Sequence, residues 1–157
     1  MLRSGMRTKL ALTLLGGVLC LTSAQAWGCK PMIHNLLKNY SGEVFLGKAL
    51  SVKDEGSAGG SSQAKTLKIQ FKVLHWLNAN TVKQTVEVNG VVNSMAGTDC
   101  QGQFDFSAKV GETRVVFGQF AKDGSFQPDH FVYIAKEDKD KIPDWLYRAY
   151  FLNQFGD

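Results

Sequence analysis

The stretch TLKIQFKVLHW, residues 66–76, decides the fold of this chain. Its apolar side chains at positions 67, 69, 71 and 73 alternate with polar side chains at positions 68, 70 and 72. A period of two predicts a strand with one buried face and one wet face. Asn78-Ala79-Asn80 predicts a turn, and residues 81–92 then alternate in the same way. The sequence therefore predicts a long antiparallel hairpin.

Three further strands are predicted outside this hairpin. Residues 43–52 form one, and Gly47 within it indicates a bulge or a sharp bend. Residues 112–120 and 126–135 form the other two. The Gly- and Ser-rich residues 53–63, and most of residues 93–110, are expected to be loops.

A helix is predicted on each side of the strands. Residues 32–40 place apolar side chains on one helical face after Pro31. A second helix over about residues 142–155 carries an apolar stripe expected to dock on the strands. That stripe comprises Ile142, Trp145, Leu146, Ala149, Leu152 and Phe155. The pattern predicts an all-β fold with flanking helices, a five-stranded OB-type barrel, with a β-sandwich as the alternative.

Residues 1–26 have the pattern of a secretory signal peptide. A basic start precedes an apolar run, residues 10–21, that is too short to span a bilayer. Ala24-Gln25-Ala26 then gives a small-x-small cleavage site. An uncleaved anchor and a lipoprotein lipidated at Cys20 are the alternatives. We expect a secreted or periplasmic protein in which residues 27–157 form a single domain without a membrane span.

The positive charge of the chain belongs mostly to this leader. The whole chain has 18 Lys and Arg against 14 Asp and Glu, a net charge of +4. Arg3, Arg7 and Lys9 leave with the leader, so 15 basic and 14 acidic side chains remain. This near balance gives no argument for binding nucleic acid.

Cys29 and Cys100 are the two cysteines that follow the leader. Export exposes them to oxidising conditions in which a disulfide persists. We expect a bridge that closes a loop of roughly 70 residues and stabilises the fold by about 4 kcal/mol. Two unpaired thiols are the alternative, and a nucleophilic Cys100 would need a nearby histidine to form its thiolate.

The chain lacks the short motifs of common enzyme and metal sites. It has no H-E-x-x-H, C-x-x-C or G-x-S-x-G pattern and no phosphate-binding glycine loop. His34, His75 and His130 are not spaced as metal ligands. Asp129 and His130 are adjacent strand residues, which point to opposite faces. We therefore predict a protein that is not an enzyme and needs no metal or cofactor.

Two groups of side chains are candidates for a ligand surface. Lys68 and Lys72, with Lys83 opposite them, form a modest basic strip that is more typical of solubility than of recognition. Aromatic residues could include a stacking platform for sugars or single strands, although their strand positions favour the core. These aromatic residues are Phe45, Phe71, Trp76, Phe117, Phe131, Tyr133 and Trp145.

In order and spacing, these elements resemble the netrin-like (NTR) domain of the tissue inhibitors of metalloproteinases and their bacterial relatives. The matching segments are Cys29-Lys30-Pro31 after a leader, GEVFLGKALSV at 42–52, IQFKVLHWL at 69–77, and Thr98-Asp99-Cys100 before Val110-Gly111-Glu112. The resemblance covers about residues 29–135. It implies an OB-type barrel with Cys29 bridged to Cys100 and a partner-binding ridge. That ridge would comprise Cys29, Lys30, Pro31, Met32, Thr98, Asp99 and Cys100.

The same resemblance suggests metalloprotease inhibition, with three departures. In the animal inhibitors the amine and carbonyl of an N-terminal cysteine chelate the catalytic zinc. Cleavage after Ala26 would leave Trp27-Gly28 ahead of Cys29, whereas cleavage after Gly28 would free its amine. Pro31 stands where the family has a second front cysteine, and Gln101 replaces the glycine that usually follows Cys100.

Three functional hypotheses follow. The first is a non-catalytic NTR-like module that binds an extracytoplasmic protein. The second is a metalloprotease inhibitor acting through Cys29, and the third is an OB-type binder of glycans or other polymers.

Overall fold

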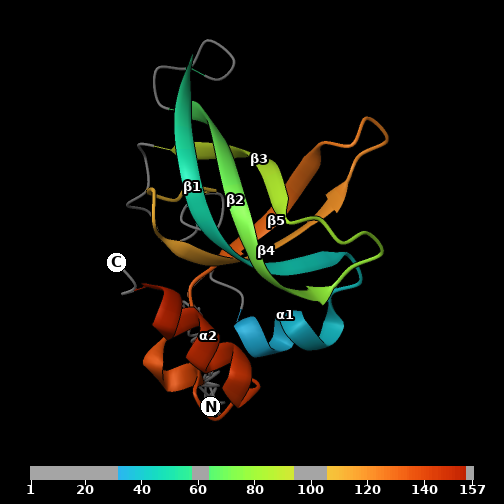
Figure 1. The fold of residues 1–157 in the computed structure, drawn as a ribbon, viewed down its shortest axis with the longest axis vertical. Coiled ribbons are helices and arrows are strands. Elements are labelled where there is room, and N and C mark those ends of the chain that lie inside the picture. The colour runs from blue at the N-terminus through green and yellow to red at the C-terminus, as the bar shows by residue number, and fades with distance from the viewer. Residues whose placement is uncertain (1–31, 58–63, 94–105, 155–157) are drawn as a thin grey trace, which may run out of the picture.

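The computed structural model describes residues 32–57, 64–93 and 106–154 (Figure 1). Two helices, five strands and a short 3-10 helix follow one another in these residues. They are α1 (Ile33–Asn39), β1 (Glu43–Ser57), β2 (Ala64–Asn78), β3 (Thr85–Asn93), β4 (Thr113–Phe120), β5 (Phe126–Val132), η3 (Lys136–Asp138) and α2 (Asp144–Gln154). The predicted leader lies outside the described residues. Within them, no helix is both long and apolar enough to cross a bilayer.

The strands close into a barrel in the order β1-β2-β3-β5-β4, and β4 returns to β1. Neighbouring strands are antiparallel except for β3 and β5, which are parallel. Figure 1 shows α1 and α2 together at one end of the barrel. The prediction of a five-stranded OB-type barrel with a short N-terminal helix and a C-terminal helix is confirmed.

Strand β1 continues beyond residue 52, where the sequence predicted that it would end. Residues 53–57 were expected to be loop, but they pair with β2 from Lys53↔Lys68 to Ser57↔Lys65. Residues 53–57 have no apolar side chain on either face, so the sequence shows no alternation of apolar and polar residues there. Cross-strand ion pairs join Lys65 to Asp54 at 3.4 Å and Lys68 to Glu55 at 3.5 Å.

Gly47 lies at a bulge in β1, as predicted. The register with β2 shifts between Leu46 and Gly47. A Cβ at position 47 would lie 2.7 Å from the Phe45 ring and 3.1 Å from the Phe71 ring. Only glycine therefore lets the strand bend here, and the bend allows β1 to pair with β2 on one side and with β4 on the other.

The side chains of β4 face two separate cores. Val116 points into the barrel, where Phe45, Phe71 and Phe126 are buried. Val115 and Phe117 point to the opposite face, against a second core that includes residues of α1 and α2. The residues at the start of β4 are therefore buried without interruption, because each face of the strand is covered by a core.

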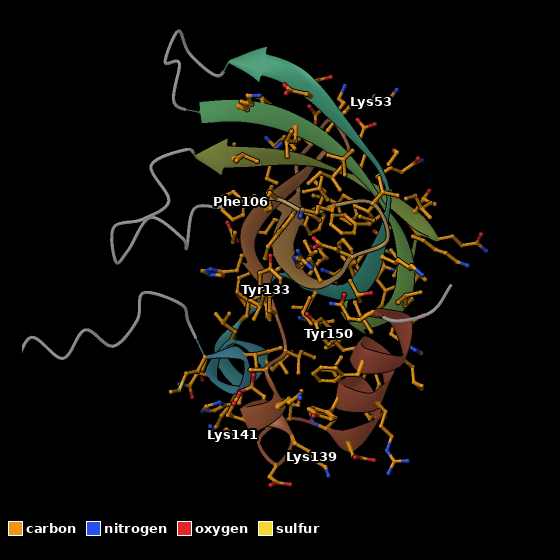
Figure 2. All side chains as sticks on the ribbon, turned by 90° about the vertical axis from the view of Figure 1, so that its left-hand side faces the viewer. Lys53, Phe106, Tyr133, Lys139, Lys141 and Tyr150 are labelled. Carbon is orange, nitrogen blue, oxygen red and sulfur yellow. The ribbon has the colours of Figure 1, made fainter. Side chains whose placement is uncertain are left out.

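The C-terminal helix docks through only part of the predicted stripe, whose members Ile142, Leu146 and Ala149 belong to or pack against the second core. Leu146 and Tyr150, four residues apart, are fully or almost fully buried, whereas Trp145 and Leu152 are 49% and 74% exposed. Figure 2 shows Tyr150 on the side of α2 nearest the barrel, with Lys139 and Lys141 at the far end of the molecule. Gln154 Nε2 also donates to the carbonyl of Thr113, at 3.0 Å.

Candidate functional site

A groove of about 440 Å³ opens where β3 and β5 separate. One wall is β3, with Thr85, Val86 and Glu87, and the opposite wall is the β4–β5 turn, with Asp123 and Ser125. The two strands share a single register position, Val88↔Phe126, so the turn before β5 diverges from β3. A cavity of this size is within the range that binds small ligands or short segments.

The β4–β5 turn is fixed by its own hydrogen bonds. Gly124 has φ of +83°, a conformation that favours glycine, and its N–H donates to Ala121 O at 2.9 Å. Asp123 Oδ1 accepts from Ser125 Oγ at 2.6 Å and from Ser125 N at 2.9 Å. These bonds, led by the one from the Ser125 hydroxyl, lower the pKa of Asp123. The turn therefore presents a negative charge to the groove.

Lys83 supplies a positive charge at the same groove. Trp76 Nε1 donates to Lys83 O at 2.9 Å, which holds the β2–β3 connection. The Lys83 ammonium lies 4.4 Å from the centre of the Phe120 ring, a cation–π contact. Among the residues that the structure describes, Lys83 has no ion-pair partner.

One lysine of the expected basic strip, Lys68, is neutralised in the fold. Lys68 lies 3.5 Å from Glu55 and 3.7 Å from Glu87. Exposed pairs of this kind add little stability, but they cancel charge. Lys83, rather than Lys68, is thus the cation that the groove leaves available.

The aromatic residues proposed as a stacking platform are mostly core. Phe45, Phe71 and Phe117 are completely buried. Tyr133 is 53% exposed, but the Arg114 guanidinium carbon lies 3.8 Å from the centre of its ring. Trp145 packs against His75 with ring centres 5.5 Å apart. The described part of the fold therefore leaves no row of open aromatic faces.

The predicted partner-binding ridge falls almost wholly outside the described residues. Cys29, Lys30, Pro31, Thr98, Asp99 and Cys100 are outside it, and so is the predicted disulfide. Met32 is described: it is 46% exposed and precedes α1, and its carbonyl accepts from Asn35 N at 3.0 Å and Leu36 N at 3.2 Å. The ridge stays a prediction.

A buried arginine cluster, which no pattern in the sequence predicted, lies at the start of β4. Arg114 is 2% exposed. Its Nη2 donates to Glu112 and, at 2.7 Å, to the Tyr133 hydroxyl, and its Nη1 donates to Thr113 O at 2.8 Å. Glu112 also accepts from Lys109 N at 2.8 Å. The arginine thus ties β4 to the residue that follows β5 and to the loop before β4.

Tyr40, at the end of α1, contacts a carboxylate and a histidine of β5. Its hydroxyl donates to Asp129 Oδ2. Its ring meets the edges of Phe117 and His130, at 5.2 Å and 6.4 Å between ring centres. No group of three or more His, Cys, Asp or Glu in the described ranges is placed to hold a metal ion.

Stability at high pH tests the Tyr40 contact. Burial, and then the Asp129 carboxylate, raise the pKa of the Tyr40 hydroxyl. The folded state therefore keeps this proton at pH values where an unfolded tyrosine, with pKa about 10, loses it. Its contribution is complete below about pH 10 and is lost as the pH rises further. Between pH 9 and 11, the free energy of unfolding measured in urea should fall less steeply for Tyr40→Phe than for the wild type. Equal slopes would contradict the contact.

No protein-family model, curated protein or solved structure matches this chain.

Proposed function

We propose that this protein is an exported, non-catalytic binding module of the NTR-like type and that it holds a segment of a protein partner in the β3 groove. The observation that carries the proposal is the groove itself, which combines a strand wall, a hydrogen-bonded turn and charged side chains of both signs. The predicted ridge at Cys29 and Cys100 would then be an additional contact surface.

A protein segment suits the groove better than a glycan. Sugar chains are held by open aromatic faces, and Phe120, the aromatic ring of this groove, is covered by Lys83. Phe120 also packs edge-to-face on Phe126 at 5.1 Å. Polar walls that carry both charges suit a polypeptide, which brings main-chain donors and acceptors with it.

Site-specific crosslinking tests this function. A photoreactive side chain at Thr85, in the groove, should capture a partner in the extracytoplasmic fraction, whereas one at Gln70, on the neighbouring strand and outside the groove, should not. The purified partner should then bind the wild type, and Thr85→Trp should weaken the affinity at least tenfold. Gln70→Trp is the matched control. Binding that Thr85→Trp leaves unchanged would contradict the proposal.

The inhibitor hypothesis has a separate test. The mass of the secreted protein, with and without reduction, reports both its start and its bridge. A chain that starts at Trp27 has no free Cys29 amine, and zinc-protease inhibition by chelation would then be excluded.

A further inference from the structure

The β3 wall of the groove is a strand edge. Val73 N donates to Gln84 O at 2.8 Å, and the register continues with Lys72↔Thr85. In an antiparallel pair, hydrogen-bonded and non-hydrogen-bonded positions alternate. Thr85 and Glu87 are therefore non-hydrogen-bonded with β2, and their main-chain N–H and C=O groups point away from β2, towards the groove.

The far end of the same strand edge is already paired with another segment of the chain. Val91, like Thr85 and Glu87, occupies a non-hydrogen-bonded position with β2, so its main-chain groups also point away from β2. It exchanges two main-chain hydrogen bonds with Phe106, of 3.1 Å and 2.9 Å. The edge is thus covered by residue 106 at Val91. Val88 itself is hydrogen-bonded with β2, so its parallel bridge to Phe126 of β5 engages the main chain of Glu87 and Asn89, the residues on either side of it. Within the described residues, no main-chain hydrogen bond joins residues 85–87 to the turn at 121–125.

An exposed strand edge of this kind accepts another strand. The added segment would lie beside β3, between that strand and the β4–β5 turn. β5 would occupy this position if it began earlier in the chain and ran along β3. Its main chain would pair with Thr85 and with the N–H of Glu87, the main-chain groups that β5 leaves open on this edge.

The charges that line the groove favour an acidic side chain at one position of that segment. Lys83 has no ion-pair partner in the described part of the chain, and it lies at the end of the groove nearest Thr85. A carboxylate there would gain an ion pair. Asp123 of the turn is negative and would repel a second carboxylate, whereas Glu87 is paired with Lys68 at 3.7 Å.

We propose that the partner segment binds as an extra β-strand on the edge of β3 and carries a single acidic side chain that pairs with Lys83. This inference rests on the proposed function, since it describes how the same groove would recognise its partner.

Defined peptides test the binding mode. The probe is a seven-residue peptide of alternating threonine and valine with one central glutamate, titrated into the isotope-labelled protein. The amide signals of residues 85–89 should shift. N-methylation of one alternate set of peptide nitrogens should weaken binding at least about tenfold, because it removes the hydrogen bonds to β3. N-methylation of the other set should change it less than about twofold. Equal effects of both sets, or shifts elsewhere, would overturn strand addition.

A charge comparison tests the acidic residue. Replacing the central glutamate by glutamine should weaken binding about threefold at low salt, in line with an exposed ion pair. That difference should vanish in Lys83→Met and persist in Lys72→Met, an exposed lysine outside the groove. A difference that survives Lys83→Met would overturn the assignment. If the peptide fails to bind but partner capture still depends on Thr85, only the strand-addition inference fails; if Thr85→Trp leaves partner binding intact, the proposed function itself fails.

Discussion

Replacing Phe45 by alanine is expected to lower the free energy of unfolding by about 4 kcal/mol, in the range found for buried phenylalanines. The Phe45 ring is completely buried in the barrel. Its centre lies 5.9 Å from that of Phe71, 5.2 Å from that of Trp76 and 5.5 Å from that of Phe126. One ring therefore joins β1, β2 and β5, and its removal would leave a cavity that none of the three strands can fill alone.

Urea unfolding followed by tryptophan fluorescence measures this loss. Val82, on the β2–β3 connection, is 78% exposed, and Val82→Ala is the matched control, expected to change stability by less than about 0.5 kcal/mol. A loss below about 1.5 kcal/mol for Phe45→Ala would mean that the aromatic cluster does not hold the barrel together.

The sequence predicted those elements whose apolar side chains form a pattern. The hairpin around residues 66–76 was recognisable because its buried side chains alternate with wet ones. β4 and β5 were recognisable from short apolar runs, at residues 115–117 and 131–134. Residues 53–57 escaped because they are polar on both faces and become a strand only through pairing with β2. In α2, apolar residues lie on more than one side of the helix, so the sequence alone did not show which side is buried. The side that packs against the second core carries Leu146 and Tyr150.

The candidate site was much less predictable. The groove exists because β3 and β5 meet at a single position, which depends on the register of the closed barrel and not on any local motif. Lys83 was expected within a strand, whereas β3 begins only at Thr85, and its location in the same groove as Asp123 could not be foreseen. The burial of Arg114 had no sequence signal either, since an arginine within a strand run is usually exposed.

Glu112→Gln should destabilise the fold by about 2–3 kcal/mol, because it leaves the Arg114 guanidinium buried without a counter-charge. A fully buried pair broken in this way costs about 3–5 kcal/mol, and the Glu112 side chain is 34% exposed, so water would reduce the loss. Glutamine still accepts from Lys109 N, which means that the change removes charge and keeps the hydrogen bond. Glu137→Gln, at an exposed position of η3, is the matched control and should have almost no effect.

The double variant Glu112→Gln with Arg114→Met distinguishes charge burial from lost packing. Methionine keeps an apolar chain over the Tyr133 ring and removes the cation that Glu112 compensates. Because the two side chains interact directly, their effects should not add, and the double variant should recover at least about 1 kcal/mol relative to Glu112→Gln alone. Urea unfolding of the four proteins measures this coupling. Simple additivity would show that Glu112 stabilises the end of the barrel through the loop before β4 and not through the buried arginine.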